Sequence, residues 1–255
     1  MQATGLRIAA AVLSGTLLYV CAAQAAAGDP LGKLSATLKG LEGDTPLKGV
    51  IAVTSRSVED GEDPMKAAIG HLELDFAAGD GLTVHMRPEL LQQIDAEELR
   101  NAADPEQKEP TVDLLRSMGP TKIGHMVSAA KELLVTLDGA TEPVSKPGTF
   151  NGAPATELSV RLPERLSKKD SGNAKDYRDR ASIWLDAQGV PLGFQETVHA
   201  KFCKFFLCIT MDRRQDMALR VIGGRLVAVS SSEELKQSGL GQGSDTLITT
   251  TLQPQ

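Results

Sequence analysis

Alternating apolar and polar positions in the last third of the chain predict a set of paired strands. Between residues 181 and 186 every second side chain is apolar, which is the period of a strand with two different faces. A similar stretch follows the turn predicted at residues 186–189. Glu196 interrupts its apolar face, which consists of Leu192, Phe194, Val198, Ala200 and Phe202. Gly223 and Gly224 stand between two apolar runs, as in a two-residue hairpin, so we expect an antiparallel meander.

Apolar side chains at three- and four-residue spacing predict helices in two other regions. Asp29 and Pro30 supply a capping acid and a first-turn proline, and four leucines follow at helical spacing up to residue 41. A second block is predicted to hold helices over residues 89–101, 112–118 and 121–138. The last of these has the clearest apolar stripe, and Gly139 is expected to end it.

The strands predicted around these helices cover residues 47–58, 65–76, 82–86, 156–162 and 246–252, in addition to the meander. The charged residues 163–180 predict a long solvated loop, and the Ser- and Gly-rich residues 230–245 predict a connection. The order is therefore helix, strands, helices, strands. This order is typical of an α+β fold, in which an antiparallel sheet carries a helical block packed on one face.

The first residues have the pattern of a secretory signal peptide. Arg7 gives a positive start, residues 8–23 are apolar or small, and Ala25 closes a small-x-small cleavage site. A retained N-terminal anchor is the other interpretation. We expect a signal peptide over residues 1–25, a single domain over residues 26–255, and a periplasmic or secreted protein. The net charge of −6, without a basic block, argues against nucleic acid as a partner.

Cys203 and Cys208 are the only cysteines after the predicted signal peptide. In an exported protein such a pair is more typical of a disulfide than of a redox-active motif, which prefers a C-x-x-C spacing. Phe205, Phe206 and Leu207 lie between them, at the tip of a predicted hairpin where a turn is normally polar. These residues either form an exposed apolar tip that contacts a membrane surface or an envelope protein, or fold back into the core.

No spacing of polar residues matches a catalytic or phosphate-binding motif. A metal site requires three or four convergent ligands, and the histidines are scattered at His71, His85, His125 and His199. No spacing places two carboxylates together, and the candidates are Asp75, Asp80, Asp212 and Asp216. We therefore expect no enzyme activity, no metal and no cofactor.

Several segments resemble the LolA/LolB-like superfamily of periplasmic lipoprotein and lipid carriers. They are the apolar helix over residues 31–41, the sequence N-G-A-P-A-T-E-L-S-V at residues 151–160 and the hairpin I-W-L-D-A-Q-G-V-P-L at residues 183–192. The resemblance implies a strongly curved antiparallel sheet, an incomplete barrel or half-barrel closed by helices, with an apolar cavity for acyl chains. It also implies that the tip at residues 205–207 is comparable to a protruding loop that aids delivery to the membrane. Two features depart from that pattern, because Val20 before Cys21 does not suit lipid attachment and the helical block is large. The chain is also similar to exported bacterial proteins that end in a comparable G-L-G-Q segment, a similarity that implies no activity.

The leading hypothesis is an exported, non-enzymatic protein that binds an apolar small molecule or lipid between the curved sheet and its helices. The candidate cavity-lining residues are Leu74, Phe76, Ile123, Met126, Val127, Leu134, Phe194 and Val198. The alternative is an envelope interaction or structural module with a solid core and no ligand. An enzyme is the third hypothesis, and it requires acids or histidines from distant segments to converge in a cleft.

Overall fold

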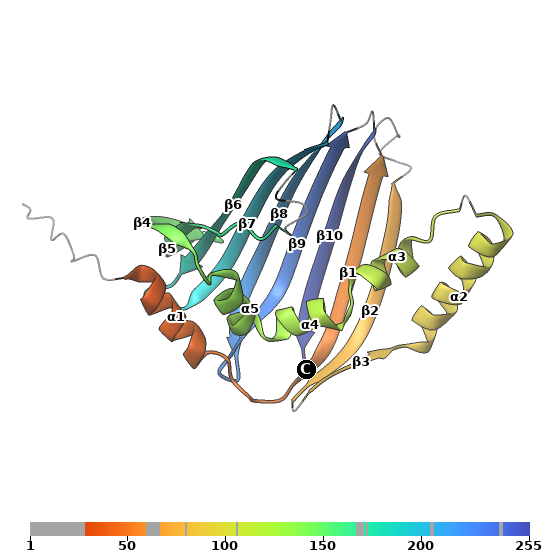
Figure 1. Cartoon of the computed structure of the whole chain (residues 1–255). Coiled ribbons are helices and arrows are strands. Elements are labelled where there is room, and N and C mark those ends of the chain that lie inside the picture. Colours follow the sequence, from red (N-terminus) through yellow and green to blue (C-terminus); the bar gives the residue numbers. More distant parts are fainter. Residues whose placement is uncertain are drawn as a thin grey trace, which may run out of the picture.

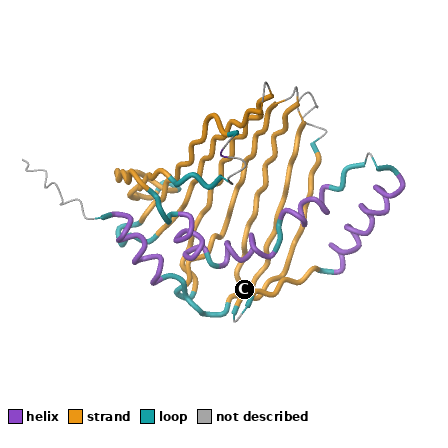
Figure 2. The backbone as a smooth tube through the Cα atoms, viewed as in Figure 1, coloured by secondary structure: helices purple, strands orange, loops and turns teal. Residues whose placement is uncertain are grey.

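The structure is a computed structural model that describes residues 29–59, 67–79, 81–105, 107–166, 171, 173–204, 207–239 and 242–255. Within these ranges ten strands form one antiparallel sheet, which is curved and open (Figure 1). Helices lie over one face of this sheet (Figure 2). The predicted α+β class and the helical block on one face are therefore confirmed. The predicted signal peptide lies outside the described residues.

The strand order across the sheet is β3-β2-β1-β10-β9-β8-β7-β6-β5-β4. Strands that are adjacent in the sheet are therefore also consecutive in the chain, with one exception. The exception is the pair formed by β1 and the C-terminal β10. The bounds are β1 Leu47–Glu59, β2 Ala68–Ala78, β3 Leu82–Met86, β4 Thr141–Phe150, β5 Ala153–Arg161, β6 Ala174–Leu185, β7 Pro191–Lys204, β8 Leu207–Ile222, β9 Arg225–Gly239 and β10 Gln242–Pro254.

The helices are α1 Pro30–Gly40, α2 Pro88–Ala103, α3 Pro110–Ser117, α4 Pro120–Val127 and α5 Ala129–Thr136. Helix α1 begins as predicted, because Oδ1 of Asp29 accepts a 3.1 Å hydrogen bond from the backbone N–H of Leu31. Helices α3, α4 and α5 cross the sheet, whereas α2 projects beyond its β3 end (Figure 1). We call the face under α3, α4 and α5 the inner face and the opposite face the outer face.

Glu97 joins α2 to the start of α3. It is buried, and its Oε2 accepts hydrogen bonds from the backbone N–H groups of Thr111 at 2.9 Å and Val112 at 3.2 Å. These amides are in the first turn of α3, where no intrahelical acceptor is available. The start of α3 also lies close to β2, since a Cβ atom on Gly70 would stand 2.3 Å from the carbonyl oxygen of Pro110. A glycine at position 70 therefore allows the helix to approach the sheet.

The prediction of one helix over residues 121–138 is wrong, because the segment forms two helices. Ser128 separates α4 from α5 and has non-helical backbone angles, with φ of −130° and ψ of 47°. An unbroken helix over those residues would be a straight rod about 27 Å long. The break lets two shorter helices follow the curved sheet, and each buries its own apolar residues, Ile123, Met126 and Val127 in α4 and Ala129, Ala130 and Leu133 in α5.

Two segments predicted to lack strands are in fact strands. Residues 174–180 of the predicted charged loop belong to β6, and most of the predicted connection over residues 230–245 forms the ends of β9 and β10. The ends of β9 and β10 pair with neighbouring strands on both sides, and residues 174–179 of β6 pair with β7. Polar side chains of these segments bond to one another instead of forming an apolar face. Lys236, for example, contacts Glu234 at 2.6 Å and Asp245 at 4.0 Å. The apolar alternation that marks a half-buried strand is therefore missing from these segments.

The core lies between the inner face and the helices. Leu34 and Leu38 of α1 and Leu133 of α5 are almost fully buried, as are sheet residues such as Ile51, Leu72, Ile183 and Leu226. Close packing also fixes one end of the sheet, where the ring of Phe150 packs 5.6 Å from that of Trp184 and lies against Gly193. The two end strands differ from the central ones: β3 has only five residues, and β4 carries Pro143 and Pro147.

A candidate ligand cavity between helices and sheet

A cavity of about 420 Å³ lies between the inner face and the helices. We call it the inner cavity. Its walls come from helices α4 and α5, from the segment at Arg165 and Leu166, and from strands β6 to β10. Its volume falls within the range of about 300–1,000 Å³ that is typical of small-molecule sites.

Methionine dominates the apolar wall of the inner cavity. Met118 and Met126 contribute from the helical side, and Met211 and Met217 contribute from β8. They are four of the seven methionines in the chain. Phe194, Val198 and Ile248 complete this wall. Methionine side chains are unbranched and polarizable, so a wall of this kind adapts to apolar molecules of different shapes.

A charged network occupies the sheet side of the inner cavity, centred on Arg213. Its Nη1 donates to Glu196 at 3.0 Å, its Nε donates to Glu233 at 2.8 Å, and its Nη2 donates to Gln215 at 2.9 Å. The strand register explains this arrangement, because Gln215 pairs with Glu196 on one side and with Glu233 on the other. Arg213 is two residues earlier on the same face and so reaches all three side chains.

Helix α4 contacts this network through Lys122. Its Nζ lies 3.3 Å from Oε2 of Glu233, and this ion pair joins the helix to β9. Burial alone would raise the pKa of Glu233, but the positive charges of Arg213 and Lys122 outweigh it and hold that pKa below its usual value. On the helical side, Nε2 of His125 lies 3.3 Å from Oε2 of Glu132. The charged side chains of the cavity are thus mostly paired with one another.

Asp179 differs from the other acids of the inner cavity. Its exposed fraction is 5%, and its Oδ2 accepts a 3.2 Å hydrogen bond from the hydroxyl of Tyr177. Its Oδ1 is buried and has no hydrogen-bond partner among the described residues. Burial, together with the negative charge of Glu196, raises the pKa of Asp179 to about 6. Burial and the charge of Asp179 in turn raise the pKa of Tyr177 to about 12.

The segment after β5 contributes to one end of the inner cavity. Nη2 of Arg165 donates to the carbonyl oxygens of Val135 at 2.7 Å and Thr136 at 2.8 Å. These carbonyls belong to the last turn of α5, where a cation is stabilised by the helix dipole. The contact holds Arg165 and the neighbouring Leu166 beside the cavity, where both are lining residues.

Only some of the residues that the sequence suggested as cavity lining do line the inner cavity. Met126, Phe194 and Val198 line the inner cavity. The other five are not lining residues of this cavity. Leu74, Phe76, Ile123 and Val127 are buried in the packed core, and Leu134 is partly buried against it.

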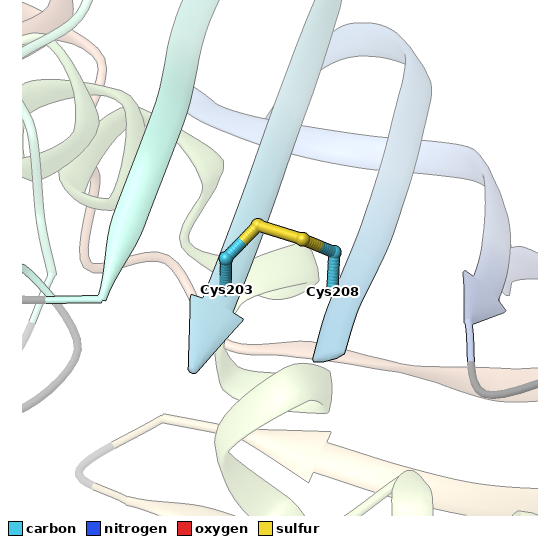
Figure 3. Close-up of a disulfide and its surroundings, with 2 residues drawn as sticks. All are labelled: Cys203 and Cys208. Carbon is cyan, nitrogen blue, oxygen red and sulfur yellow. A yellow bond between two sulfur atoms is a disulfide. The ribbon is translucent and has the colours of Figure 1, made fainter. Parts of the chain in front are cut away.

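The predicted disulfide between Cys203 and Cys208 is present. It joins the facing ends of β7 and β8 across a Cα–Cα distance of 4.1 Å (Figure 3). Of the three residues proposed as an apolar tip, Phe205 and Phe206 lie outside the described residues. Leu207, the first residue of β8, is 48% exposed.

The outer face over β6 to β9 carries a different kind of surface. A hollow of about 570 Å³ there is lined mainly by charged side chains. They pair with each other, for instance His199 with Asp212 at 2.6 Å and Lys236 with Glu234 at 2.6 Å. No group of three or more potential metal ligands is found within the described ranges. The inner cavity, which combines an apolar wall with buried polar groups, is therefore the stronger candidate site.

Sequence patterns did not identify the polar part of this site. Arg213, Glu233 and Asp179 come from three strands, and no local spacing connects them. One signal was present, because Glu196 interrupts the apolar face of β7, and a charged side chain on such a face requires a partner. The segments that hold Asp179 and Glu233 were predicted to be loops, so their shared face was not recognised.

Comparisons with models of known protein families, with curated proteins and with solved structures find no match for this chain. Over the described residues, no helix has the length and apolar character needed to cross a bilayer.

Proposed function

We propose that this chain is an exported, non-enzymatic binding protein that holds an apolar ligand, an acyl or lipid chain, between its curved sheet and its helices. The inner cavity is the observation that carries this proposal. Its volume suits a small molecule, and its wall of four methionines together with Phe194, Val198 and Ile248 offers a continuous apolar contact. The disulfide supports export, because such bonds persist in oxidising compartments.

The network around Arg213 has the character of a binding site more than of a catalytic one. Arg213 is held by Glu196, Gln215 and Glu233, so its donors are directed at the protein itself. A fixed network of this kind gives the apolar wall a rigid polar boundary. The similarity to LolA/LolB-like carriers is a further reason to expect an acyl chain, and membership of that superfamily is part of the proposal.

Two measurements test this function: identification of any ligand that co-purifies with the protein, and binding of an added fluorophore. The protein is purified without detergent and extracted with organic solvent, and the extract is analysed by mass spectrometry. Binding of the apolar fluorophore N-phenyl-1-naphthylamine is then measured by titration. We expect a co-purified lipid or saturable binding of the fluorophore at one site per chain. A protein that yields neither would support the alternative of an envelope interaction module without a ligand.

Two neighbouring serines provide a matched pair of variants. Ser231 lines the inner cavity, so Ser231→Phe places a ring inside it. Ser232 alternates onto the outer face of the same strand, where it pairs with Asp216 of β8. We expect Ser231→Phe to abolish fluorophore binding and Ser232→Phe to preserve it. Equal binding by both variants would place the fluorophore elsewhere and contradict the proposal.

A further inference from the structure

The cations around the inner cavity are already occupied by groups of the protein. Arg213 donates to three side chains, Lys122 pairs with Glu233, and Arg165 donates to two helix carbonyls. A ligand with an anionic head group would therefore have to displace one of these contacts to gain a counter-charge. These ion pairs are partly buried, and removing one partner leaves a poorly compensated charge, which is unfavourable.

Glu196 and Glu233 are paired with these cations, but Asp179 is not. Oδ1 of Asp179 has no donor among the described residues, although the side chain is 95% buried, with an exposed fraction of 5%. Buried acceptors are almost always hydrogen-bonded, so an unpartnered carboxylate oxygen in a cavity wall needs an explanation. Tyr177 occupies the other oxygen, and it holds the carboxylate in place from the same strand face.

We propose that Asp179 is the recognition group for the polar end of the ligand, and that it selects an apolar chain ending in a hydrogen-bond donor, a hydroxyl or an amine. This inference rests on the proposed function and specifies the ligand class of the same cavity. The methionine wall takes the chain. Oδ1 of Asp179 has almost no accessible surface, so the carboxylate turns toward the cavity to accept the hydrogen bond from the donor. The site then discriminates against anionic amphiphiles, because their head group would meet the carboxylate of Asp179, while the cations of the same wall are held by Glu196 and Glu233.

Other features of the wall agree with a donor head group. Burial raises the pKa of Asp179 to about 6, so at neutral pH the group is an ionised acceptor in a desolvated place. A hydrogen bond to such a charged group is stronger than one between neutral groups. A site built to pair with a donor also rejects molecules that lack it, because its own polar group is then left unpaired.

The test compares three ligands of equal chain length: 1-decanol, decylamine and decanoate. Each displaces N-phenyl-1-naphthylamine from the wild-type protein at pH 7.5. We expect decanol and decylamine to act at a concentration at least about tenfold lower than decanoate, as a charge-assisted hydrogen bond implies. Displacement by decanoate at the same or a lower concentration overturns the inference and leaves the binding function intact. A protein that binds neither the fluorophore nor any of the three overturns both.

A conservative variant assigns the selectivity to one carboxylate. Asp179→Asn keeps the shape of the side chain and replaces one acceptor oxygen with a donor. The affinity of the variant for the fluorophore, which itself carries an N–H donor, is measured first, and each displacement is expressed relative to it. We expect the variant to lose the preference for decanol and decylamine over decanoate. Asp176→Asn is the control, since Asp176 belongs to the outer face of the same strand and pairs with Arg178. An unchanged preference in Asp179→Asn overturns the assignment, and so does an equal change in Asp176→Asn.

Discussion

The hydroxyl of Tyr177 donates a 3.2 Å hydrogen bond to Oδ2 of Asp179, two residues further along the same face of β6. The hydroxyl does not compensate fully for the burial of this carboxylate, whose Oδ1 has no partner among the described residues. Keeping the negative charge in that position therefore lowers the free energy of unfolding. Such a cost is common where a side chain is retained for binding and not for stability.

The burial of Asp179 predicts a pH-dependent gain from Asp179→Asn. The pKa of this group is about 6 in the folded protein and 3.8 by its ordinary value, so the folded state binds more protons between these pH values. The free energy of unfolding therefore falls as pH rises from about 4 to 6, because the carboxyl of the folded protein loses its proton. Above pH 6 the full cost of burying the ionised carboxylate is present. Two pKa units correspond to about 3 kcal/mol, which is an upper bound. We expect Asp179→Asn to raise the free energy of unfolding in urea by about 1–3 kcal/mol at pH 7.5 and to bring little gain at pH 4. The same gain at both pH values would contradict the explanation.

Adjacent arginines on β8 provide a second test, because they point to opposite faces. Arg213→Ala leaves Glu196 and Glu233 without their main counter-charge in the inner cavity, and we expect a loss of about 3 kcal/mol in the free energy of unfolding. Arg214 is 54% exposed and pairs with Asp216 on the outer face. Arg214→Ala should therefore cost less than about 1 kcal/mol. Chemical unfolding of both variants measures the difference, and equal losses would show that the inner network is no more important than a surface ion pair.

The junction between α2 and α3 depends on Glu97. Glu97→Ala removes the acceptor for the backbone N–H groups of Thr111 and Val112, and we expect a loss of about 1–2 kcal/mol, as for a deleted helix cap. Hydrogen exchange of these amides should become faster than in the wild-type protein. Glu98→Ala is the matched control, because Glu98 is an exposed residue of the same helix. Exchange that is unaffected by Glu97→Ala would contradict the capping role.

The disulfide should make only a modest contribution to stability. Cys203 and Cys208 are five positions apart, so the bond closes a very short loop and removes little entropy from the unfolded chain. For the double variant Cys203→Ser with Cys208→Ser we expect a loss of about 2 kcal/mol. Thermal unfolding of the variant, and of the wild-type protein with and without a reductant, measures this loss. A protein that fails to fold without the bond would show that the hairpin requires it for more than its register.

The sequence predicts those elements in which one apolar face alternates with a polar one. The strands around Ile51 and Ile183 and the first helix, with Leu34 and Leu38, belong to this class. The sequence does not predict the polar ends of β9 and β10. Lys236 pairs with Glu234 along β9 and with Asp245 across to β10, and these polar positions leave no apolar period. Nor does the sequence predict the break at Ser128, since the apolar stripe of residues 121–138 suits one helix as well as two. The curvature of the sheet decides between them.

The candidate site depends on the register between neighbouring strands. Three of its predicted residues, Met126, Phe194 and Val198, were found because large apolar side chains on a helix and a strand usually face a common interior. The contact of Arg213 with Glu196 and Glu233 requires β7, β8 and β9 to pair in one register. That register is a property of the whole sheet. Only the position of Glu196 on an otherwise apolar face indicated that a counter-charge was needed.

An open sheet leaves two edges at which another strand is able to add, and the two end strands reduce this risk in different ways. Pro143 and Pro147 remove two amide donors from β4, and β3 offers only five residues. A second molecule therefore finds a poor template for continuing the sheet at either end. Replacing both prolines would restore those donors, and the chain would then be more prone to self-association through β4 as its concentration rises.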